Sequence, residues 1–119
     1  MKQDLKVRTK QFAIDVWNLC SKLPHSREYN NYVNQLLRCS SSVAANYRAV
    51  SRAKSTADFI NKLKIVEEET NESQFFLELI ERINANDELN LELKRLIKEA
   101  NELVSIVVAS LKTDQTNNM

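Results

Sequence analysis

Few side chains in this sequence are of the types that move protons, attack a carbonyl or bind a metal. His25 is the only histidine, and it lies beside Pro24, where we interpret it as a solvated turn residue. With one histidine, the paired Glu-x-x-His motifs of di-iron bundles cannot form. Ser40, Ser41 and Ser42 have no nearby histidine to act as their base, and a chain without glycine has no phosphate-binding loop. We therefore expect no enzyme, no metal and no cofactor.

The densest group of carboxylates is Glu67 to Glu69, followed by Glu72. Three consecutive helical positions point across about 200° of a helix, so their side chains cannot converge on one ion. We interpret most of this group as a solvated helix face. An alternative is that Glu69 or Glu72 pairs with an arginine of a neighbouring subunit.

Basic residues are arranged more regularly than the carboxylates. At 100° per residue, Arg38, Arg48 and Arg52 fall within an arc of about 80° on one predicted helix, and Lys54 extends this basic strip. Guanidinium groups fit phosphate oxygens, so the strip could contact a nucleic-acid backbone without reading its sequence. The amino-terminal helix would add charge from Lys2, Lys6, Arg8 and Lys10.

A simpler interpretation of the strip is that it is an ordinary charged helix face. Arg48 or Arg52 would then pair with Asp58 or with the acidic helices of the same chain. Base stacking has little support, because Trp17 and the phenylalanines are expected to be buried and only Tyr29 and Tyr32 could lie near the strip.

The charge is divided unequally along the chain. Residues 1–54 contain ten Lys or Arg against three Asp or Glu, while residues 55–119 contain seven against thirteen. The net charge of +1 therefore conceals a basic first half and an acidic second half. Such a division favours a polyanion as partner of the first half, or an acidic surface of another subunit.

Composition predicts an all-α protein, because the 119 residues include no glycine and one proline. Cys20 and Cys39 are expected to be buried thiols, which fits a reducing, cytoplasmic setting. Charge follows directly after Met1, and no apolar run reaches about 18 residues, so we expect neither a signal peptide nor a membrane span.

Apolar periodicity predicts four helices. The first ends before Pro24, the second runs from a Ser26 cap to about Ser51, and the third runs from a capping box at Ser55 and Asp58 to about Ile83. The fourth follows a cap at Asn86 or Asp87, and the third is expected to be the longest. We predict an antiparallel up-down-up-down four-helix bundle over residues 1–112, with a polar, frayed tail over 113–119.

Some apolar residues fall outside the predicted core stripes. They indicate either a wide core or a subunit interface. They are Ile60, Ile65, Phe75, Phe76, Leu79, Ile106 and Val108.

The middle of the chain contains a spaced pattern of residues: Glu28, Gln35-Leu36-Leu37-Arg38, Ser42-Val43, Asn46, Arg52, Ser55 and Asp58-Phe59-Ile60. This pattern resembles that of the bacterial four-helix-bundle family of 23S rRNA-intervening-sequence proteins, and the likeness extends over about residues 12–111. The chain departs from the family pattern at Ala49-Val50, where many members have Glu-Gly, and at Glu68-Glu69, where they have Gly-Ser.

This resemblance implies a homopentamer without enzymatic activity. It also implies a likeness in fold to the accessory variability protein of diversity-generating retroelements, which binds nucleic acid and a reverse transcriptase. We expect Arg38, Arg48, Arg52 and Lys54 to contact RNA or DNA, and Asn46, Ser55 and Asp58 to have structural or interface roles. In the alternative hypothesis the protein is an interaction scaffold or accessory subunit, and its arginines contact a sister subunit or a protein partner.

Overall fold

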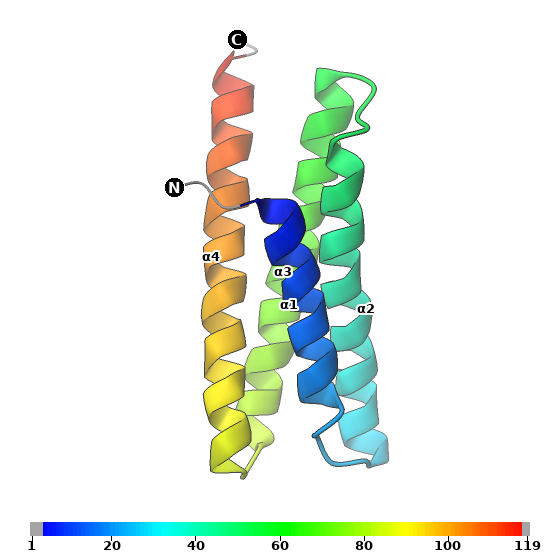
Figure 1. The fold of residues 1–119 in the computed structure, drawn as a ribbon, viewed down its shortest axis with the longest axis vertical. Coiled ribbons are helices and arrows are strands. Elements are labelled where there is room, and N and C mark those ends of the chain that lie inside the picture. Colours follow the sequence, from blue (N-terminus) through cyan, green and yellow to red (C-terminus); the bar gives the residue numbers. More distant parts are fainter. Residues whose placement is uncertain (1–3, 118–119) are drawn as a thin grey trace.

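Four helices make up the part of the chain that the structure, a computed structural model, describes: residues 4–117, with side chains up to residue 113. They are α1 (Leu5–Cys20), α2 (Arg27–Val50), α3 (Thr56–Ile83) and α4 (Asp87–Asn117). Each helix runs antiparallel to the next and packs beside it, and α1 closes the bundle by contacting α4 (Figure 1). The predicted up-down-up-down bundle is confirmed.

Polar side chains begin the last three helices, as their sequence positions predict. Ser26 Oγ accepts a hydrogen bond from the Tyr29 amide at 3.1 Å, and Ser55 Oγ accepts one from the Asp58 amide at 3.1 Å. At the start of α4, Asn86 Oδ1 accepts a hydrogen bond from the Leu89 amide at 3.0 Å. Each cap satisfies an amide that has no partner within the helix.

The fourth helix is longer than predicted. It has 31 residues, against 28 for α3, so the expectation that the third helix is the longest was wrong. It also continues to Asn117, past the predicted boundary at residue 112. No proline or glycine follows Lys112, so the backbone hydrogen bonds can propagate into the polar segment. The last two residues of the predicted tail lie outside the described residues.

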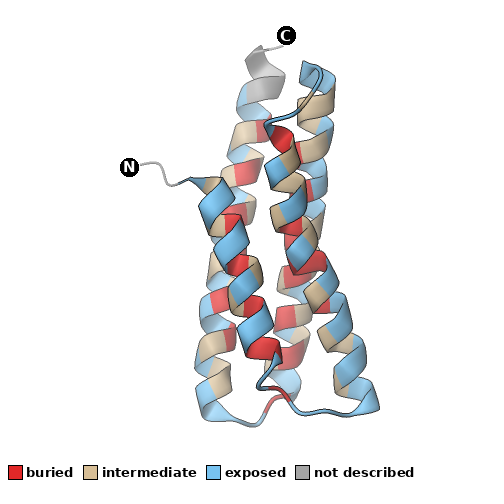
Figure 2. Cartoon of the chain, turned by 45° about the vertical axis from the view of Figure 1, so that its right-hand side comes forward, coloured by how far each residue is buried: buried red, intermediate tan, exposed pale blue. Residues whose placement is uncertain are grey.

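Figure 2 shows buried residues, in red, on all four helices, and they form two clusters because α1 is short. One cluster combines α1 residues such as Phe12 and Val16 with Leu36, Leu77 and Leu96 of the other helices, and we call this part the four-helix half. The second cluster is built from α2, α3 and α4 alone: Val43, Val50, Leu63, Val66, Val107 and Leu111. We call this part the three-helix half; it is the upper end in Figure 1, beyond the start of α1.

Both cysteines are buried in the four-helix half and neither is in a disulfide, as expected. Burial raises the pKa of the Cys20 thiol to about 12, and burial likewise raises the pKa of Cys39. Both side chains therefore remain neutral thiols that pack as small apolar groups. Within the described part of the chain, no helix is long and apolar enough to cross a membrane.

Candidate nucleic-acid interface

Three of the four predicted nucleic-acid contacts lie together at the carboxyl end of α2. Arg48 is on the last turn of this helix, while Arg52 and Lys54 are in the connection to α3. All three are exposed, and none of their side chains forms an ion pair with a carboxylate of residues 4–113. We call them the basic turn; it is at the top right of Figure 1, in the three-helix half.

Arg38 has a different environment from the basic turn. Its guanidinium group is bound by Glu69, at 3.5 Å, and by Glu72 of the adjacent α3, and its side chain is 50% exposed. The alternative that Glu69 or Glu72 pairs with an arginine of another subunit is therefore not needed to satisfy these carboxylates. A partner phosphate would have to compete with two carboxylates, so Arg38 is a weaker candidate than the sequence indicated.

The predicted capping box at the start of α3 is present and holds the basic turn in place. Asp58 Oδ2 accepts a hydrogen bond from the Lys54 amide at 2.9 Å, while Ser55 Oγ accepts one from the Asp58 amide. In the usual capping box, the acidic side chain accepts a hydrogen bond from the amide of the cap residue, which here is Ser55. In this chain the shorter Asp58 side chain accepts instead from the amide of Lys54, the residue before the cap. Asp58 also pairs with Lys62 at 2.7 Å, so it does not neutralise Arg48 or Arg52.

These bonds act on the Asp58 carboxyl itself. The hydrogen bond from Lys62 and then the one from the Lys54 amide lower the pKa of Asp58 below its usual value. The carboxylate therefore keeps its charge into acidic solution and continues to hold the connection between α2 and α3.

Asn46 satisfies its side-chain donor within its own helix. Its Nδ2 donates to the carbonyl oxygen of Ser42 at 2.9 Å and to Ser42 Oγ at 2.8 Å. The residue is half-buried, and its polar group was expected to need a partner. Because this partner is one helical turn away, the hydrogen bond stabilises α2 without help from another subunit.

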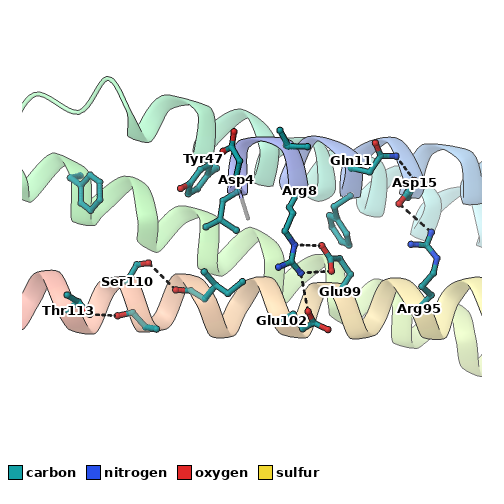
Figure 3. A pocket seen from close by; sticks show the side chains of 16 residues that line it. Asp4, Arg8, Gln11, Asp15, Tyr47, Arg95, Glu99, Glu102, Ser110 and Thr113 are labelled. Atoms are coloured by element: carbon teal, nitrogen blue, oxygen red, sulfur yellow. Dashed lines mark hydrogen bonds and ion pairs between the residues drawn. The ribbon is translucent and has the colours of Figure 1, made fainter. Parts of the chain in front are cut away.

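The first helix contributes less free positive charge than expected. Lys6 and Lys10 are exposed, but Arg8 binds Glu99 of α4 with two hydrogen bonds of 3.0 and 2.7 Å, and also Glu102 at 3.1 Å (Figure 3). The Glu99 hydrogen bonds are the main reason that the pKa of Arg8 is raised. The Arg8 side chain is 18% exposed, so its role is to join α1 to α4. Lys2 lies outside the described residues.

A second ion-pair group joins the same two helices. Arg95 of α4 contacts Asp15 of α1 at 3.4 Å and Glu92 at 2.8 Å, and Gln11 donates to Asp15 at 2.9 Å (Figure 3). Sequence reasoning did not find these pairs. Glu99 and Glu102 share one face of α4 by their spacing, but only the relative height of two helices decides which arginine meets them.

An open groove of about 1460 Å³ runs along α1 and α4 and past the start of α1. Figure 3 shows the two ion-pair groups beside it and Tyr47 at the point where α1 begins. Apolar side chains line the rest of the groove, among them Leu5, Phe59 and Ile106. The groove exists because α2, α3 and α4 continue past the amino end of α1.

The aromatic residues are not all in the core, contrary to expectation. Trp17 is 64% exposed and Phe75 is 54% exposed, whereas Phe12 is fully buried. Of the apolar residues outside the predicted stripes, Ile65 is also exposed, and the others are partly buried: Ile60, Phe76, Leu79, Ile106 and Val108. The wide-core interpretation therefore explains only part of this set.

Comparison with known proteins identifies the family. The sequence profile of the 23S rRNA-intervening sequence proteins matches residues 2–109. The chain belongs to this family. A comparison with curated proteins finds no match.

A solved structure shows the same bundle as this 23S rRNA-intervening sequence protein. It is a protein of unknown function from the S23 ribosomal protein family of Bacteroides thetaiotaomicron, with 29% sequence identity and a TM-score of 0.82. The match covers 92% of the present chain and 99% of the other chain. The structural match therefore extends over most of the bundle.

Proposed function

We propose that this 23S rRNA-intervening sequence protein is a non-enzymatic homo-oligomer that binds the backbone of RNA or DNA through Arg48, Arg52 and Lys54. The observation that carries the proposal is that these three cations lie together, exposed, with no carboxylate of residues 4–113 paired to them. Guanidinium and ammonium groups in such a position can bind phosphates without first breaking an ion pair.

The proposed binding is weak for one subunit and strengthened by repetition. Three phosphate contacts provide little affinity at physiological salt, and they carry no sequence information. An oligomer displays the basic turn once per subunit, so a long polyanion can bind several turns at once. The pentamer implied by the family resemblance would present five basic turns. The exposed apolar side chains of Trp17 and Phe75 support an oligomer, because they need to be covered.

Salt-dependent filter binding tests the nucleic-acid part of the proposal. The name of the family makes a 23S rRNA fragment the first probe, with duplex DNA of the same length beside it. If each bound subunit makes three phosphate contacts with duplex DNA, the logarithm of the binding constant should fall with the logarithm of the salt concentration with a slope of about −2.7 per subunit. Arg48→Glu with Arg52→Glu should abolish retention at physiological salt.

A matched variant controls for total charge. Lys22→Glu with Arg27→Glu makes the same change in charge at exposed positions between α1 and α2, at the other end of the bundle. This variant should retain binding. Equal loss in both variants, or binding that added salt does not weaken, contradicts a specific role for the basic turn.

The same variants also test the alternative function, in which the protein is a scaffold whose arginines contact another protein. If Arg48→Glu with Arg52→Glu leaves nucleic-acid retention unchanged but alters the native mass measured by light scattering, these residues contact a sister subunit. Arg38 is a weaker candidate for such a contact, because α3 carboxylates of the same chain already bind it.

A further inference from the structure

An apolar stripe runs along the outer side of α1. Val7, Ile14 and Trp17 are all exposed, and at 100° per residue they fall within an arc of about 80°. The same helix buries Phe12, Val16 and Leu19 on its other side. The three exposed residues therefore lie on a continuous face that the bundle does not cover, which we call the α1 face.

A similar stripe runs along the outer side of α3. Ile65, Phe75 and Ile83 are exposed and Leu79 is partly buried, and these four again fall within an arc of about 80°. The core residues of α3, such as Leu63, Val66 and Leu77, occupy the opposite side of the helix. We call this stripe the α3 face.

The two faces lie on opposite sides of one molecule. α1 packs beside α2 and α4, and α3 lies diagonal to it across the core, with α1 in front of α3 in Figure 1. They also overlap in height, because Phe12 and Val16 belong to the same core cluster as Leu77 and Ile80. The α1 face is thus level with Phe75, Leu79 and Ile83.

The charges within the two stripes have opposite signs. Lys10 is the only charged residue in the arc of the α1 face, and Glu68 and Glu72 are the only charged residues in the arc of the α3 face. Lys64 and Arg82 lie just outside the α3 arc, and Glu72 is already paired with Arg38 of its own chain, so Glu68 is the carboxylate of the arc that forms no ion pair among residues 4–113. Lys10 of one copy can therefore pair with Glu68 of the next, whereas two α1 faces would bring lysines together.

We infer that the α1 face of one copy docks against the α3 face of the next, with Trp17 packed among Phe75, Leu79 and Ile83. Tryptophan in such a position is the type of residue that dominates interface energies. Because the two faces differ, the contact is heterologous, and repetition of it closes a ring or extends a filament. The inference rests on the oligomer of the proposed function and not on its nucleic-acid binding. It leaves the basic turn uncovered.

Single substitutions on each face provide the first part of the test. Trp17→Asp and Phe75→Asp should each reduce the native mass to that of a monomer, with self-association at least about 30-fold weaker than in the wild type. Leu91→Asp is the matched control, since Leu91 is an exposed leucine of α4 outside both faces. This control should keep the wild-type mass. Circular dichroism should show the same helix content in all four proteins, since the substituted side chains are exposed.

Mixing the two variants tests whether the contact is heterologous. Trp17→Asp retains an intact α3 face and Phe75→Asp retains an intact α1 face, so an equimolar mixture should form a one-to-one heterodimer that grows no further. If α1 faces paired with each other, Trp17→Asp would dissociate the assembly while Phe75→Asp would not, and the mixture would give no heterodimer. That result would overturn the inference.

Fluorescence of Trp17, the only tryptophan, provides an independent measurement. Its emission should shift to the red when the wild-type protein is diluted to monomer. Phe75→Asp should cause the same shift at concentrations where the wild type is assembled. Within one chain, Trp17 and Phe75 are exposed on the outer sides of two diagonal helices, so such a shift indicates contact between copies.

The outcomes separate this inference from the proposed function. A wild-type protein that is monomeric at high concentration overturns both the oligomer and the docking. An assembly that keeps its mass in Trp17→Asp and Phe75→Asp, or that loses it equally in Leu91→Asp, overturns only the docking. Nucleic-acid binding is tested separately by the variants of the basic turn.

Discussion

The two halves of the bundle differ in the number of helices that surround the core. In the four-helix half, α1 covers the core, and Phe12, Leu36 and Leu77 have 0–1% exposure. In the three-helix half, the same α2, α3 and α4 continue without α1, and Tyr47 and Phe59 line an open groove. The comparison shows that the end of one short helix decides where the side of the bundle is open, since the groove continues past the start of α1.

The attachment of α1 also differs on its two sides. It packs against α2 mainly through the apolar core, whereas Arg8 and Arg95 connect it to α4 through carboxylates. The α2–α3 contact has its own ion pair at Arg38, which is more exposed than Arg8. Ion pairs are therefore expected to contribute more to the α1–α4 contact than to the α2–α3 contact.

The largest predicted effect compares equal deletions in the two halves. Leu36→Ala removes side-chain volume from the closed core and should lower the free energy of unfolding by about 4 kcal/mol. Leu63→Ala makes the same deletion in the three-helix half and should cost about 3 kcal/mol, because fewer helices surround this cluster and Phe59, which packs against it, lines the open groove and can move. Urea denaturation followed by circular dichroism measures both. A larger cost for Leu63→Ala would contradict the comparison.

A smaller effect is predicted for the ion pairs. Arg8→Met leaves Glu99 and Glu102 close together without their cation, and should lower the free energy of unfolding by about 1–2 kcal/mol. Arg38→Met is the matched change between α2 and α3, and should cost about 0.5 kcal/mol or less because that arginine is half exposed. The same denaturation experiment at low and high salt should show a larger salt effect on the wild type than on Arg8→Met. Equal costs for the two variants would show that both contacts depend on ion pairs to the same extent.

The smallest effect concerns pH and the capping box in the three-helix half. The pKa of Asp58 is lowered in the folded protein, so its contribution to stability is present above the unfolded pKa and is lost as pH falls through the folded pKa. Asp58→Asn should be slightly less stable than the wild type at neutral pH. This difference should disappear in acid, and thermal unfolding at several pH values measures it. A difference that grows in acid would contradict the assigned cause.

Much of the fold could be predicted from apolar periodicity and helix caps. Ser26, Ser55 and Asn86 act as caps where their positions indicate, because a cap depends on residues only three positions apart. The end of α4 was predicted five residues too early, since a polar composition was taken as a stop signal although no helix-breaking residue is present. The exposure of Trp17 was missed because it lies one position from the buried Val16, at the edge of the predicted stripe.

The candidate site could be predicted only in part, because some of its contacts are made between different helices. Arg48 and Arg52 are exposed as their place opposite the core stripe indicates, and Lys54 follows them in the connection. Arg38 lies on the same side of α2, but its carboxylate partners belong to α3, 31 and 34 residues later. Spacing along one helix cannot show which charges of another helix come within 4 Å.

The sequence by itself determined the elements of this protein: four helices, their caps, their buried faces and the concentration of positive charge in the first half. Each of these depends on interactions between residues a few positions apart, or on composition. Only the tertiary structure decided the height of each helix, that is, its position along the bundle axis relative to its neighbours. That height places Arg8 against Glu99, opens the groove past the start of α1 and sets two apolar faces on opposite sides of the bundle. Helix height is the result of packing over the whole core, in which many contacts between distant segments are optimised together.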